Sequence, residues 1–277
     1  MTDDGHYYKK SLALLRHDRG WIKPLLVMAA ANLVPIAGSL GCNGYAVEWA
    51  RLIAWGVDAA PKQRNVRIGE CISAGWRAFI GALWVGLAVY VLNLLFTSVL
   101  KEGAVTSTFS LLLSFIAPFL IPVAALHATI YHDFKAGWQI KRIWSLIKAD
   151  HKSAWRLFRL SIVLQLVIGL ILSLVWMAIF ILIASQLSDS YLMLAYSDVL
   201  QDVTASYVMY ATADLLRLVA ANALPCAIAA FISSLGLSFV QMIQMCATGL
   251  WLRQFDVPTW QESNKIFEEK KLRHKSS

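Results

Sequence analysis

Long uncharged apolar segments alternate along this chain with more polar segments that differ in their content of Lys and Arg. The four clearest apolar segments are residues 78–100, 107–131, 160–185 and 226–252. Each is longer than the roughly 20 residues that a helix needs to cross a hydrocarbon core of ~30 Å. The pattern predicts an all-α fold, a polytopic membrane helical bundle of about four full spans, with residues 1–277 forming a single integral membrane domain.

Prolines modify two of these segments. Pro118 and Pro122 lie inside 107–131, where they should kink the helix and leave backbone carbonyls for neighbouring helices to satisfy. The apolar stretch 218–252 is too long for one span, and Pro225 divides it. We therefore place the span at 226–252 and treat 214–224 as its lead-in on the outer side.

A fifth apolar segment, residues 24–56, is broken by the stretch NLVPIAGSLGCNGY at 32–45. Helix-disfavouring residues recur through this stretch, and we expect four of them to interrupt a helix that packs closely against its neighbours: Pro35, Gly38, Gly41 and Gly44. Such a break is tolerated at membrane depth only where protein or a wet cavity covers the backbone.

Positive charge orients the predicted spans. Segments 45–77, 132–159 and 253–277 carry five, seven and six Lys and Arg, whereas 101–106 carries one and 186–214 carries none. Short basic loops stay in the cytoplasm, so the C-terminal tail at 253–277 should be cytoplasmic. Residues 1–23 also carry five basic residues, which favours a cytoplasmic N-terminal segment and a re-entrant path for 24–56. The alternative is a full short span with the N-terminus outside.

An internal similarity supports that alternative. AGWRAFIG at 74–81 resembles SAWRLFRL at 153–160, and each lies at the cytoplasmic start of a predicted span. A proline-bearing apolar segment that ends in Tyr precedes each of them, at Pro35 to Tyr45 and at Pro122 to Tyr131. A true duplication would make the first of these segments a span like the second, and repeated membrane units commonly form a site at their interface.

Composition agrees with a membrane protein. The chain of 277 residues is 58% hydrophobic and 15% charged, against about 45–50% and 25% in soluble domains. The net charge of +8 is then a sign of orientation, and no nucleic-acid partner is expected. The four Cys form no C-x-x-C pair and are interpreted as buried thiols. No catalytic, cofactor-binding or metal-binding motif is apparent, so no cofactor is expected.

The N-terminal third resembles a known family. A Trp-started apolar segment leads into VPIAGSLGCNGYAVEWARL, followed by a Pro and then by a Gly-Trp start to the next span. These features are similar to a prokaryotic membrane family known as domain of unknown function 4013, best over residues 20–90. Its pattern falls here on Pro35-Ile36, Gly44-Tyr45, Arg51 and Pro61. The resemblance implies a small multi-span protein in a prokaryotic cytoplasmic membrane and implies no activity.

Candidate site residues cluster after the break. Tyr45, Glu48 and Arg51 follow Gly44, and the last two share one face of a helix. Ionisable groups near bilayer depth suggest function, so Glu48 could contact a cation or substrate; an ion pair at the membrane surface is the alternative. His127 is expected to make an interhelical hydrogen bond, and His132 with Asp133 to cap a helix on the inner side.

Other polar residues lie within or beside the spans: Asn32, Asn93, His127, Gln165, Asn222, Gln241 and Gln244. They are expected to hydrogen-bond one helix to another. The alternative is that several of them line a polar cavity.

Two connecting segments have helical periodicity. In 134–160 we predict two helical pieces that meet near Asp150-His151, the first lying along the inner leaflet through Ile140, Ile143, Trp144 and Ile147. Its basic residues should contact anionic lipid headgroups. Segment 186–214 is predicted to form a helix on the outer surface, and the tail after residue 260 to be solvated.

Three classes of function remain open. The leading interpretation is a non-catalytic membrane partner, scaffold or regulatory subunit of a membrane complex, either with another membrane protein or as a homo-oligomer. The alternative is a transporter-like or lipid- or small-molecule-handling protein with its site at the broken helices, and the third is a membrane enzyme. A polar cavity open to one side would favour the second class over the first.

Overall fold

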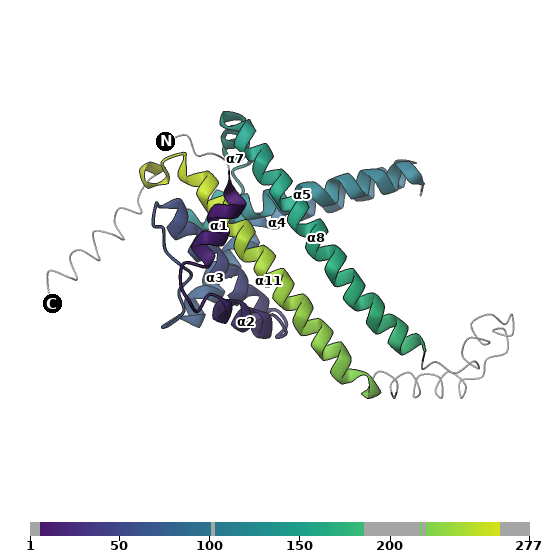
Figure 1. The fold of residues 1–277 in the computed structure, drawn as a ribbon. Coiled ribbons are helices and arrows are strands. Elements are labelled where there is room, and N and C mark those ends of the chain that lie inside the picture. The colour runs from purple at the N-terminus through teal and green to yellow at the C-terminus, as the bar shows by residue number, and fades with distance from the viewer. Residues whose placement is uncertain (1–5, 101–102, 186–216, 218–219, 261–277) are drawn as a thin grey trace.

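The fold is known from a computed structural model that describes residues 6–100, 103–185, 217 and 220–260. Every regular element among those residues is helical (Figure 1). In chain order the helices are α1 (Tyr7–Leu15), α2 (Ile22–Ala31), α3 (Ala37–Ala54), α4 (Ile68–Leu100), α5 (Ala104–Ile130), α6 (Phe134–Gly137), α7 (Ile140–Ala149), α8 (His151–Ala184), α11 (Ala223–Arg253) and the 3-10 helix η2 (Val257–Trp260).

Four of these helices, α4, α5, α8 and α11, are long and apolar enough to cross a membrane. The predicted all-α bundle with four spans is therefore confirmed. Helices α4 and α8 begin well before the apolar segments, at Ile68 and His151. The start of α8 is capped by a side chain: Asp150 accepts a bond of 3.2 Å from the amide of Ser153.

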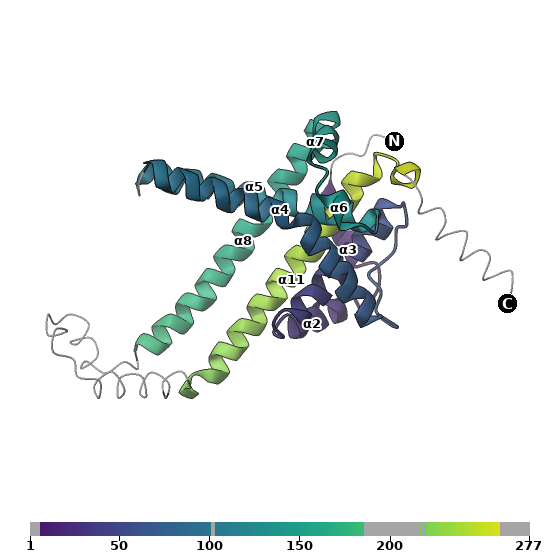
Figure 2. The same cartoon turned by 180° about the vertical axis from the view of Figure 1, so that it is seen from behind.

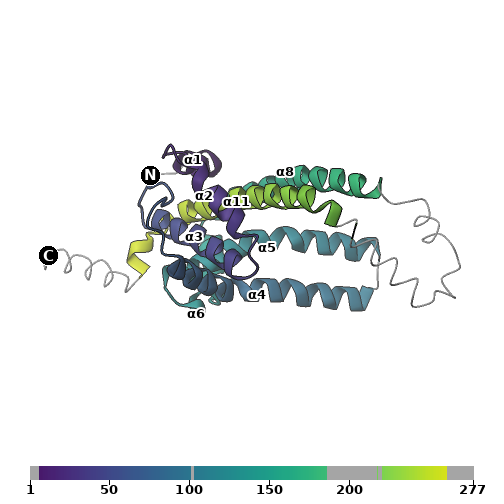
Figure 3. The same cartoon turned by 90° about the horizontal axis from the view of Figure 1, so that it is seen from below.

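The long helices form two pairs that diverge from a common base. Figure 3 shows α4 beside α5 and α8 beside α11, and Figures 1 and 2 show the two pairs separating with distance from the base. The buried core lies at the base, where Ile53 of α3, Leu126 of α5, Leu157 of α8 and Trp251 of α11 are all almost fully enclosed. Away from the base the helices expose apolar side chains, as membrane spans do.

Helix α3 occupies the centre of the base, where small residues on it or on its neighbours let the crossing backbones approach closely. A Cβ atom at Gly44 would lie 2.6 Å from the amide nitrogen of Gly75 in α4, and closer still to the carbonyl oxygen of Cys71. On another face, a Cβ at Gly249 of α11 would lie 2.5 Å from the carbonyl oxygen of Ala50. Backbones pack this closely only at small residues.

The predicted break in residues 24–56 is present, but only at residues 32–36; Gly38, Gly41 and Gly44 were expected to interrupt the helix as well, and this is wrong, because they lie inside α3. Helix α2 ends at Ala31, Ile36 has a φ of +60°, and α3 starts at Ala37. The two helices form a hairpin. The segments just before α2 and just after α3 lie close together, as the contact between Gly20 and the side chain of Gln63 shows. Ten residues of α2 extend only about 15 Å, half of a bilayer core. The re-entrant path itself remains a prediction.

The close packing predicted for the hairpin glycines holds at two of three positions. Gly38 lies against the carbonyl of Ala31, and Gly44 lies against α4. Gly41 was expected to do the same, and this is wrong: a Cβ there would meet only Ile72 Cγ1, at an ordinary 3.7 Å. Gly41 lies one turn before Gly44 and borders a cavity, where no backbone approaches it closely.

The carbonyl freed by a proline is satisfied as expected. Pro122 has no N–H to donate to Pro118, and Gln244 of α11 donates its Nε2 to that carbonyl instead. The same amide donates to Ser161 Oγ of α8 at 2.8 Å. One side chain therefore joins α5, α8 and α11 at the base.

The remaining polar residues of the spans mostly link helices, as predicted. Asn32 donates to Ser238, Gln241 donates to Asn43, and Asn93 accepts from Ser110. Gln165 instead contacts Ser161 of its own helix. These hydrogen bonds leave few of the intramembrane polar groups to line a cavity.

The connecting segment 134–160 forms helical pieces that meet at Asp150, as predicted, with the short α6 as an addition. The apolar stripe of α7 is divided: Ile143 is buried against protein, whereas Ile140 and Trp144 are about half exposed. Contact with a lipid surface remains a prediction for those two residues. The helix predicted within 186–214 and the tail after 260 lie outside the described residues.

The α3–α4 crossing gives a direct test. We expect Gly44→Ala to lower the apparent melting temperature of the purified protein by several degrees, because overpacking costs about 1–3 kcal/mol and each kcal/mol shifts the melting point by roughly 2–4 °C. Gly41→Ala is the matched control and should melt like the wild type. Equal melting temperatures for the two variants would contradict the close crossing.

Candidate functional site

A charged cavity of about 480 Å³ lies at the base, between α3, the start of α4 and the loop that joins them. Its charged lining comprises four cations and two carboxylates: Arg51, Lys62, Arg67, Arg77, Glu48 and Glu70. Arg67 and Glu70 form their own exposed ion pair at 2.7 Å. The deeper part of the cavity therefore has a single carboxylate, Glu48, for several cations.

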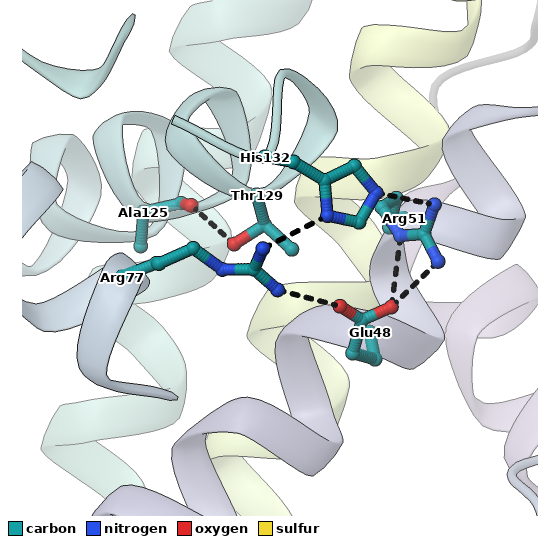
Figure 4. A network of polar contacts seen from close by, with 6 residues as sticks. All are labelled: Glu48, Arg51, Arg77, Ala125, Thr129 and His132. Carbon is teal, nitrogen blue, oxygen red and sulfur yellow. Dashed lines mark hydrogen bonds and ion pairs between the residues drawn. The ribbon is translucent and has the colours of Figure 1, made fainter. Parts of the chain in front are cut away.

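Glu48 lies close to Arg51 and farther from Arg77 (Figure 4). Its Oε2 accepts from Arg51 Nε at 2.8 Å and lies 2.7 Å from Arg51 Nη2. Its other oxygen is 3.9 Å from Arg77 Nη2, which is too long for a hydrogen bond. The side chains of all three are between 21% and 27% exposed, so they are only partly solvated. Arg77 is therefore the less neutralised guanidinium.

His132 completes the cluster by contacting both arginines. Arg77 Nη1 lies 3.0 Å from Nδ1 of the imidazole, and Arg51 Nη1 lies 3.4 Å from Nε2. A neutral imidazole has one acceptor nitrogen, so we assign the shorter contact as the hydrogen bond that Arg77 donates. Burial, followed by the charges of Arg51 and Arg77, lowers the pKa of His132. The ring is thus held neutral between two cations.

The backbone conformation at the end of α5 determines the position of the His132 ring. Helix α5 ends in a Schellman motif: the amide of His132 bonds to the carbonyl of Thr129 at 3.2 Å, and the amide of Asp133 bonds to Ala128 at 3.1 Å. His132 has a φ of +52°, a left-handed conformation that usually belongs to Gly at this position. A non-Gly residue held in such a conformation suggests a functional role for its side chain.

A second, more apolar cavity of about 350 Å³ adjoins the first. It lies between the α2–α3 hairpin and the start of α4, and Gly41, Val27 and Met28 are among its lining residues. The two cavities share Tyr45, Lys62, Val66 and Cys71. Tyr45 donates a hydrogen bond of 2.7 Å to the carbonyl of Lys62, and burial raises its pKa. Charged and apolar spaces thus meet at Tyr45.

The structure brings together some of the residues predicted from sequence. Tyr45, Glu48 and Arg51 line the charged cavity, and Gly38 and Gly41 line the apolar one. Pro35 is exposed in the hairpin turn, and Gly44 is a packing contact. The predicted ion pair between Glu48 and Arg51 is present.

His127 lies elsewhere in the base. It is fully buried, and its Nδ1–H donates to the carbonyl of Ala136 in α6 at 2.8 Å, which is the predicted link between helices. Its ring packs against Tyr131 and Trp260. Among the residues that the structure describes, no group of three or more His, Cys, Asp or Glu is arranged to hold a metal ion.

Sequence analysis missed two members of the cluster. Arg77 belongs to the Trp-Arg-x-Phe motif that begins a span, and an arginine at that depth was itself a signal. His132 was expected to act as a helix cap with Asp133. Asp133 does cap α6, accepting from the amide of Lys135 at 3.0 Å, but His132 faces the arginines instead.

The lowered pKa of His132 predicts a pH dependence. Above pH ~6.5 the histidine is neutral in both folded and unfolded chains; below it the unfolded chain binds a proton that the folded site resists, so stability falls as pH falls. We expect the apparent melting temperature to drop by a few degrees between pH 7.5 and 5. His132→Asn, which tolerates a positive φ, should show a smaller drop. An equal drop in both proteins would contradict this origin.

One sequence family covers the elements that build the site. The family described as Protein of unknown function (DUF4013) matches residues 27–181, more than half of the chain, from within α2 to near the end of α8. The match includes the whole charged cluster and extends well beyond residues 20–90. No curated protein and no solved structure matches the chain. The chain belongs to the DUF4013 family of proteins of unknown function.

Proposed function

We propose that this multi-pass membrane protein binds a small anionic amphiphile, with the anionic group in the charged cavity and the apolar part in the adjoining cavity. The observation that carries the proposal is the cluster in which one carboxylate, Glu48, serves two guanidinium groups. We therefore favour a protein that handles lipids or small molecules at its broken helices over a non-catalytic scaffold.

Charge supports an anion in the cavity. Arg77 has only a neutral imidazole at hydrogen-bond distance, and its buried Nε has no partner among the described residues. A phosphate or carboxylate group could accept from such a guanidinium through paired, charge-assisted hydrogen bonds. In a partly desolvated site such bonds are stronger than in water. The anion would also offset the excess positive charge that surrounds Glu48.

The apolar cavity supports a ligand with a short hydrocarbon part. Cavities of about 480 and 350 Å³ are both in the range of small-molecule sites. Because four residues border both, a ligand in contact with Arg77 and Arg51 lies next to an apolar space lined by α2 and α3. A purely inorganic anion would leave that space without a function.

A second candidate is a membrane partner or scaffold, either with another protein or with further copies of this chain. It is favoured by the diverging helix pairs, since none of the most apolar window of α8 is buried. Lipid can cover those faces equally well, so this observation is weaker than the charged cluster. No arrangement of the described residues supports an enzyme over either candidate.

We also propose that the base of the bundle faces the cytoplasm of a prokaryotic cell, with both termini on that side. The flanks of the α2–α3 hairpin return together near Gly20 and Gln63, which fits a re-entrant element. Helices α4 and α8 begin at this base with the basic residues of the two Trp-Arg motifs. Short basic segments stay on the cytoplasmic side.

Binding can be measured by calorimetry on the protein in nanodiscs of zwitterionic lipid, with inorganic phosphate and hexyl phosphate as probes. We expect hexyl phosphate to bind more tightly than inorganic phosphate. Arg77→Gln should weaken both about tenfold or more, because a hydrogen bond to a charged group contributes ~1.5–3 kcal/mol. Arg253→Gln removes the same charge from an exposed ion pair with Asp58 outside the cavity, and it should change the affinity for neither probe.

Gly41→Leu separates the two halves of the site. The added side chain enters the apolar cavity without a backbone clash, so it should remove the advantage of hexyl phosphate and leave inorganic phosphate unaffected. If Arg77→Gln and Arg253→Gln have the same affinity for the probes, the proposed anion site is wrong. If hexyl phosphate binds the wild type no more tightly than inorganic phosphate does, the proposal that the ligand is an amphiphile is wrong.

Orientation can be tested with an impermeable maleimide on intact cells, using single cysteines in a background without the native four. His17→Cys and Lys62→Cys, at exposed positions on the two flanks of the hairpin, should react only after permeabilisation. Ser107→Cys, at the opposite end of α5, should react in intact cells. Labelling of His17→Cys in intact cells would show that the hairpin crosses the membrane.

A further inference from the structure

A separate groove of about 840 Å³ runs between α1, α8 and the middle of α11, on another part of the base from the charged cavity. Its lining comes from the residues at the start of α1, from one side of α8 between Arg156 and Ile168, and from Phe239 of α11. None of these residues borders either cavity of the proposed amphiphile site. The groove is therefore an independent feature.

Positive charge gathers at one end of this groove. Lys9 of α1 and Arg156 and Arg159 of α8 are all exposed, and the lining contains no carboxylate. Within the described part of the chain none of the three forms an ion pair, in contrast to the arginines around Glu48. Three cations that have no ion pair among the described residues, gathered in one groove, favour binding of a negatively charged group.

The rest of the groove is apolar. Leu160, Val163, Leu164, Val167 and Ile168 follow the spacing of one helix face, and Phe239 of α11 adds an aromatic side chain to the lining. Val163 and Val167 are each more than half exposed. The cations lie where α8 leaves the base, and the apolar face runs from them along the span. This order of charge and hydrocarbon is that of a lipid whose headgroup lies at the membrane surface.

Helix α1 is held firmly enough to form a wall. Tyr7 is 2% exposed, and its hydroxyl accepts a hydrogen bond of 3.0 Å from Gln254 just after α11. Leu15 at the other end of α1 is fully buried. Figure 1 shows α1 lying across the base in front of α11. Helix α1 thus contributes Lys9 to the lining of the groove, and α8 contributes the two arginines.

We propose that this groove binds one anionic phospholipid, with its phosphate among Lys9, Arg156 and Arg159 and an acyl chain along the apolar face of α8. Basic pockets beside transmembrane helices are suited to anionic headgroups. A soluble anion would leave the apolar face of the groove unused. A zwitterionic lipid would satisfy that face but would leave the three positive charges uncompensated.

The test uses native mass spectrometry of the full chain in detergent, with phosphatidylglycerol and phosphatidylcholine of identical acyl chains. We expect phosphatidylglycerol to bind roughly tenfold more tightly to the wild type. The double variant Arg156→Gln/Arg159→Gln should lose this preference, since each basic residue contributes to headgroup affinity. Arg16→Gln/Arg19→Gln removes the same charge outside the groove and should keep it.

Val167→Trp provides a second variant that changes no charge. It should narrow the apolar part of the groove and weaken the binding of phosphatidylglycerol, while leaving the melting temperature of the lipid-free protein unchanged. Equal binding of the two lipids to the wild type, equal losses in the two double variants, or full displacement of the lipid by inorganic phosphate would each overturn the proposal. Because the comparison of lipids on the wild type needs no variant, a misfolded variant does not remove the test.

Discussion

The contact on which the rest of the structure depends is the backbone approach of α3 to α4 and α11. Gly44 and Gly75 meet on one side of α3, and Ala50 and Gly249 meet on the other. Small residues at these contacts let the backbones approach closely, and the resulting van der Waals packing stabilises the association of the helices. It allows α3, the least apolar of the larger helices, to occupy the centre of the base.

That central position determines where the charges lie. One turn beyond Gly44, Glu48 and Arg51 project toward Arg77 of α4, and the left-handed residue at the end of α5 presents His132 to the same point. Partly desolvated charges are costly unless they are paired. A cluster with one carboxylate, two guanidiniums and a neutral imidazole is incompletely paired, and this imbalance is the physical basis for a bound anion.

Much of the fold follows from the sequence, and less of the site does. Runs without charge predicted the four spans, and Pro35 predicted the break before α3, whereas the glycines that follow it lie inside that helix. Gly41 could not be distinguished from Gly44 in advance, because spacing alone does not say which face of a helix meets a backbone. Glu48 and Arg51 are three residues apart and were recognisable as a pair. Arg77 and His132 join them through tertiary contacts that no local pattern encodes.

The most direct measurement of the central claim is a cryo-electron microscopy structure of the protein in nanodiscs with hexyl phosphate. We expect density for the phosphate between the guanidinium groups of Arg51 and Arg77, with the hydrocarbon chain extending past Tyr45 toward Gly41. Two results would contradict this expectation. In one, Arg77 pairs closely with Glu48 and the probe binds elsewhere; in the other, side chains close the cavity.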